Sequence, residues 1–143
     1  YYDNKQFTLE EYLKIEQEYI SFYQEILKKF KVDKIKIHSL EKYWTLDEVM
    51  QQMEKYNIIF TEQEKNIYTN LQNKYLTTID NFNIIFKFVM RELLWCKIAT
   101  PNKKITIEFG YDYYTYLNLA NLVIGKNLVE KWASKGIFIE PFI

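Results

Sequence analysis

One segment of this 143-residue chain is apolar around almost its whole circumference when its residues are placed on a helix. From an Asp80 cap to about Ile98, only Asn83, Lys87 and Arg91 form a narrow polar stripe. The apolar positions are Phe82, Ile84, Ile85, Phe86, Phe88, Val89, Met90, Leu93, Leu94, Trp95 and Ile98. A helix of this kind is usually packed on several sides. We therefore expect it to be the central helix of the core, around which the rest of the chain is arranged.

Three other helices are announced by a threonine that is followed three positions later by a glutamate. In such a capping box, the two side chains satisfy the free amide groups of the first helical turn. The pairs are Thr8 with Glu11, Thr45 with Glu48, and Thr61 with Glu64. Apolar periodicity predicts helices over 9–30, 46–57 and 62–76, and a last helix over 121–135 that stops at Gly136.

Strands are expected where apolar and polar residues alternate with a period of two. Residues 34–38 alternate in this way, and residues 104–109 give the best strand, with Ile105, Ile107 and Phe109 on one side. Gly110 marks a bulge or a bend before pairing resumes, and residues 137–139 supply a closing strand. The prediction is one α+β domain over 1–143, dominated by about five helices with a small, largely antiparallel sheet of about three strands. Residues 1–6 are expected to be flexible.

The charge balance argues against nucleic acid as a partner. Lysine and arginine together number 19, aspartate and glutamate also number 19, and Arg91 is the only arginine. Proteins that bind nucleic acid usually carry a surplus of basic residues that neutralises phosphates. No apolar run approaches the roughly 20 residues that span a bilayer, and the first residues do not resemble a signal peptide. We expect a cytoplasmic protein without a membrane partner, although Tyr1 is not an initiator methionine.

The side chains that catalysis requires are few. His38 is the only histidine and Cys96 the only cysteine, and the three glycines form no phosphate-binding motif. Cys96 lies in an apolar run, where a buried structural thiol is the ordinary outcome. We therefore predict that the chain is not an enzyme and holds no cofactor or metal. A carboxylate pair of Glu108 and Asp112 leaves a small hydrolase open as an alternative.

An aromatic cluster from Phe109 to Tyr116 is the best candidate for a binding site. Tyrosine offers a large contact area with little conformational entropy to lose, and acidic residues within the cluster disfavour nucleic acid. Tyr111 and Tyr113 point inward if the strand continues without a bulge, and this assignment is reversed if Gly110 is a bulge. The candidate residues for binding a partner are Glu108, Tyr111, Asp112, Tyr113, Tyr114 and Tyr116.

The stretch ITIEFGYDYYTYL, followed by a helix and then GIFIEPF, resembles a pattern in small bacterial immunity proteins of polymorphic and contact-dependent toxin systems. The resemblance implies an intracellular, non-enzymatic protein that binds a toxin domain tightly and blocks its active site. Immunity proteins against nucleases are often strongly acidic, whereas this chain is neutral. Two alternatives therefore remain: the toxin is not a nuclease, or the interface is more apolar.

Two further alternatives belong to other functional classes. A structural or adaptor subunit could act as a homodimer that buries the surplus aromatic side chains. A phage-type inhibitor would also bind a protein without catalysing a reaction. The leading expectation is an immunity-type protein that neutralises a cognate toxin by binding it.

Overall fold

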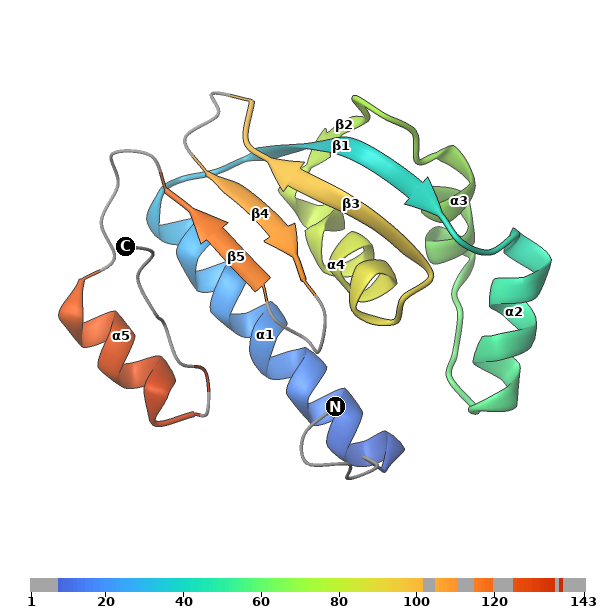
Figure 1. The fold of residues 1–143 in the computed structure, drawn as a ribbon, viewed down its shortest axis with the longest axis horizontal. Helices are drawn as coiled ribbons and strands as arrows, with labels where there is room; N and C mark the ends of the chain where they lie inside the picture. The colour runs from blue at the N-terminus through green and yellow to red at the C-terminus, as the bar shows by residue number, and fades with distance from the viewer. Residues whose placement is uncertain (1–7, 102–104, 111–114, 120–124, 136, 138–143) are drawn as a thin grey trace.

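The computed structural model describes residues 8–101, 105–110, 115–119, 125–135 and 137. Over these residues the chain forms a five-stranded antiparallel sheet in the order β2-β1-β3-β4-β5, with helices packed on one face (Figure 1). The predicted α+β class is confirmed, but the sheet has five strands instead of about three. Residues 1–6, Gly136 and most of the predicted closing strand lie outside the described residues.

The described elements include the expected five α-helices. In chain order they are α1 (Leu9–Lys29), β1 (Lys34–Lys42), α2 (Leu46–Lys55), α3 (Glu62–Asn70), β2 (Leu76–Thr78), the 3-10 turn η1 (Ile79–Asn81), α4 (Phe82–Met90), β3 (Leu94–Ala99), β4 (Thr106–Phe109), β5 (Thr115–Asn118) and α5 (Lys126–Ala133). Helix α3 ends at Asn70 instead of continuing to residue 76, and Leu76 begins β2. The threonine starts of α1, α2 and α3 are confirmed, since each hydroxyl accepts the amide N–H of the glutamate three residues on.

The largest correction concerns the segment predicted to be one helix from Asp80 to Ile98. Helix α4 stops at Met90, and β3 follows through the middle of the sheet. From Leu94 to Ile98 the strand alternates between buried and half-buried side chains, as expected for β structure. Its period of two was hidden because Trp95, on the more exposed face, is itself apolar. A short, wholly apolar run fits a buried helix and a buried strand equally well.

Three helices end in the same way, without glycine. Each has a residue with positive φ after its C-cap, and the next amide N–H bonds back to the carbonyl five residues earlier, which is the Schellman arrangement. The positive-φ residues are Lys31 after α1 (56°), Asn57 after α2 (56°) and Glu92 after α4 (59°). The bonds run from Val32 to Leu27, from Ile58 to Met53 and from Leu93 to Phe88. Apolar residues at both ends of each bond turn the chain back toward the core.

Helix α4 lies between the sheet and the other helices. Six of its nine residues are buried, and it contacts β3, α1 and α3. Aromatic rings join it to these neighbours. Phe86 lies 5.4 Å from Tyr23 of α1 and 5.4 Å from Phe109 of β4, and Phe88 lies 5.3 Å from Tyr68 of α3, measured between ring centroids. The expectation of a central core helix is thus confirmed for residues 82–90.

A buried ion pair fastens the end of α4 to α1. Nη2 and Nε of Arg91 donate to the two carboxylate oxygens of Glu16 at 2.8 and 2.9 Å. The side chains are only 9% and 3% exposed. Burial alone would lower the pKa of Arg91, but the hydrogen bonds and the charge of Glu16 raise it above its ordinary value. The pair therefore stays charged and joins the end of α4 to α1 by two charge-assisted hydrogen bonds.

We predict that Arg91→Ala lowers the free energy of unfolding by about 3–5 kcal/mol, because it leaves the carboxylate of Glu16 buried and unpaired. The double variant Glu16→Leu with Arg91→Met should recover most of this loss, since apolar groups replace both charges. Urea denaturation measures both effects. Lys126→Ala is the control, because it breaks an exposed ion pair with Glu130. An Arg91→Ala loss no larger than that of the control would contradict the prediction.

The helix ends generate a second prediction. Lys31→Gly should raise the free energy of unfolding by roughly 0.5–1 kcal/mol, because a side chain in the left-handed region is strained and glycine is not. Asn57→Gly should gain less, because asparagine tolerates this region better than lysine does. Thermal unfolding compares the two variants. Equal gains, or a loss from Lys31→Gly, would show that these φ values are not strained.

Candidate functional site

Helices α1 and α4 lie on one face of the sheet (Figure 1). Ile35, Ile37, Cys96, Ile98 and Ile107 are buried on the helix side, so their strand neighbours lie on the opposite side. We call this opposite side the open face. Its described members that are exposed or half-buried are Lys34, Lys36, His38, Glu41, Leu76, Thr78, Trp95, Lys97, Thr106, Glu108, Tyr116 and Asn118.

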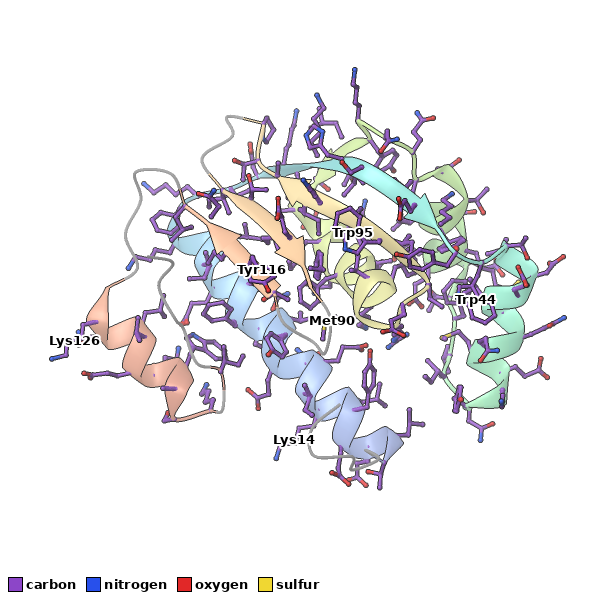
Figure 2. The ribbon with its side chains drawn as sticks, viewed as in Figure 1. Lys14, Trp44, Met90, Trp95, Tyr116 and Lys126 are labelled. Atoms are coloured by element: carbon purple, nitrogen blue, oxygen red, sulfur yellow. The ribbon has the colours of Figure 1, made fainter. Side chains whose placement is uncertain are left out.

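Two aromatic side chains meet the backbone at the end of β4. Nε1 of Trp95 donates a hydrogen bond to the carbonyl oxygen of Phe109 at 3.0 Å. A Cβ atom placed on Gly110 would lie 2.9 Å from Cε2 of Tyr116, so the tyrosine ring lies directly against this glycine. Figure 2 shows Trp95 and Tyr116 over the strands of the sheet. Held in this way, the two rings lose little freedom when they contact a partner.

A row of side chains crosses four strands of the open face. His38 pairs with Lys97, and Glu108 pairs with Tyr116 in the strand register. Nζ of Lys97 lies 3.3 Å from a carboxylate oxygen of Glu108, which joins the two halves of the row. Such an exposed pair contributes little to stability. It does compensate the charge of Glu108, which is therefore a poor candidate for a free catalytic carboxylate.

Only part of the predicted binding cluster is described. Glu108 and Tyr116 lie opposite each other on the open face, 43% of Tyr116 being exposed. Tyr111, Asp112, Tyr113 and Tyr114 lie outside the described residues, so their orientation stays a prediction, and so does a carboxylate pair of Glu108 with Asp112.

Gly110 was expected to mark a bulge or a bend before pairing resumes, and the structure does not show the bulge. Strand β4 ends at Phe109, which pairs with Thr115 of β5, so Gly110 begins the connection of a hairpin and is not a bulge within a strand. The alternation of Ile105, Ile107 and Phe109 toward the core is confirmed. Alternation alone could not show the reversal, because the tyrosines continue the pattern that the strand begins.

Trp95 and Lys97 were missed as candidates because the sequence placed them in a helix. No local signal could have found them, because the apolar side chain of Trp95 hides the alternation of Leu94, Cys96 and Ile98 with these two residues. The same strand, β3, places the single cysteine on the buried side of the sheet. Cys96 is fully buried, and this burial raises the pKa of its thiol to about 12, so the thiol stays protonated and packs as a small apolar group.

Within the described ranges, no three histidine, cysteine, aspartate or glutamate side chains are grouped so that they could hold a metal ion. No helix in the same ranges is long and apolar enough to cross a membrane. No family model, curated protein or solved structure matches this chain. The side chains of the open face are thus the basis for assigning a function.

The contact between Gly110 and Tyr116 yields a prediction. Gly110→Ala should push the tyrosine ring away from the backbone, because the new Cβ would lie closer to the ring than carbon atoms approach. The change should appear as shifted NMR signals of the Tyr116 ring. Gly125→Ala is the control, since a Cβ there meets only the Nζ of Lys29, at 3.8 Å. Unchanged Tyr116 signals in Gly110→Ala would disprove the contact.

Proposed function

We propose that this chain is an immunity-type protein, which acts in the cytoplasm by binding a cognate toxin domain on its open face. The single observation that carries the proposal is the presentation of two aromatic rings at the end of β4, with Tyr116 against Gly110 and Trp95 bonded to the carbonyl of Phe109. Aromatic side chains are enriched among the residues that dominate protein interfaces. Both rings are partly accessible while their positions are set by the sheet.

The polar surroundings of these rings also suit a protein partner. Lys97, Glu108 and His38 lie in the adjacent row, so donors and acceptors of both signs border the aromatic contact area. Protein interfaces typically combine an apolar centre with a polar rim of this kind. The resemblance of residues 105–117 and 136–142 to immunity proteins supplies the class of partner. Binding, and not catalysis, is the proposed activity.

A homodimer is the competing proposal. Leu76, on the same face, is 51% exposed, and a second copy of the chain could cover it together with the aromatic rings. Sedimentation velocity separates the two proposals. A monomer at micromolar concentration supports the immunity-type function, whereas a tight dimer that Tyr116→Ala dissociates supports self-association.

Co-expression tests the proposed function. The chain should restore growth to cells that express the toxin encoded beside its gene, and Tyr116→Ala should weaken this rescue by removing a central aromatic contact, typically worth about 2 kcal/mol or more. Tyr56→Ala is the matched control, because Tyr56 is 50% exposed at the end of α2 and lies away from the open face.

Soluble wild-type protein that fails to rescue growth would contradict the immunity-type function. Equal rescue by Tyr116→Ala and Tyr56→Ala would instead move the binding surface away from the open face. Circular dichroism of both variants checks that each has kept its fold.

A further inference from the structure

Two lysines at the beginning of β1 stand out on the open face. Lys34 lies opposite Thr78, and Lys36 lies opposite Leu76 on one side and Ala99 on the other. None of these neighbours is acidic, and the described part of the chain forms no ion pair with either lysine. Two ammonium groups therefore border Leu76, which is 51% exposed.

The other charges of this face are placed differently. Lys97 is paired with Glu108. Glu41 lies near the opposite end of β1, across from Trp95. The local charge of the open face is thus positive around Lys34 and Lys36, where no acidic residue neutralises it. Near the two aromatic rings the local charge is neutral or negative. The whole chain carries no net charge, so this local excess would act only over about 10 Å at ordinary salt concentration.

We propose that the partner bound on the open face is a protein with an acidic surface, whose carboxylates contact Lys34 and Lys36 beside an apolar group on Leu76. This inference rests on the proposed function and specifies the chemistry of its partner. It reverses the charge expected from the sequence, which pointed to acidic residues of this chain as the contacts. The partner supplies the acids, and this chain supplies the lysines.

Nucleic acid is also anionic, but the face suits it less well. Bases would have to stack on Trp95 or Tyr116 to use the aromatic rings. Glu41 lies opposite Trp95 and Glu108 lies opposite Tyr116, so the phosphates of a stacked strand would approach carboxylates. Lysines on exposed strands also discourage unwanted pairing between sheets. That role needs no partner, and a titration with an acidic peptide distinguishes it from partner binding.

The test is an NMR titration of the full, isotopically labelled chain with three probes. The first is a synthetic peptide in which glutamate alternates with leucine and tyrosine, the second has lysine in place of glutamate, and the third is oligothymidine. The acidic peptide should shift the backbone signals of Lys34, Lys36 and Leu76. Added salt should weaken its binding.

Charge reversal sharpens the test. Lys34→Glu with Lys36→Glu should weaken binding of the acidic peptide about tenfold. The matched control is Lys14→Glu with Lys126→Glu, which reverses two exposed lysines on α1 and α5, away from the open face (Figure 2). This control should bind the peptide as the wild type does.

Four results would overturn the inference: no shifts with the acidic peptide, shifts confined to other surfaces, equal binding of the basic peptide, or tighter binding of oligothymidine on this face. The growth assay separates this inference from the proposed function. If Lys34→Glu with Lys36→Glu still rescues growth while Tyr116→Ala does not, the proposal of an acidic partner surface is wrong. The proposal that the partner binds the open face then still stands.

Discussion

The burial of α4 is the constraint on which the rest of the structure depends. This nine-residue helix can hide Phe82, Ile85, Phe86, Phe88, Val89 and Met90 only if the sheet covers one side and α1 and α3 cover others. Glu16 and Arg91 then fix its end against α1. Because α1 and α4 lie on the same side of the sheet, the opposite face is left to the alternate residues of five strands (Figure 1). The candidate binding surface is thus a consequence of how the core is closed.

The signals that were read correctly from the sequence are local. The threonine and glutamate pairs mark helix starts because they bond within a single turn, and Ile105, Ile107 and Phe109 mark one face of a strand. The signals that failed depend on distant residues. Nothing within LLWCKI distinguishes a buried helix from a strand, which is decided by β1 and β4 on either side. The helix end before Glu92 was also hidden, since glutamate does not favour positive φ.

The candidate site likewise combines residues that the sequence indicates with residues that only the strand pairing reveals. Glu108 and Tyr116 were selected from sequence, and the hairpin places them opposite each other. Trp95, Lys36 and Lys97 join them only through strand pairings that the sequence did not reveal. The importance of Glu108 also changes. In the sequence it suggested either catalysis, as a pair with Asp112, or an acidic interface. Beside Lys97 it is a compensated member of a polar row, and Lys34 and Lys36 are the lysines of the open face that no described acid pairs with.

The central claim is that the open face docks a protein partner, and cross-saturation NMR tests it most directly. In this measurement, saturation of the proposed partner, a toxin domain, passes to the labelled residues that contact it. We predict transfer to Tyr116, Lys97 and Leu76, with little at Lys14 of α1 or Lys126 of α5. Transfer concentrated on α1 and α5, with the open face unaffected, would contradict it.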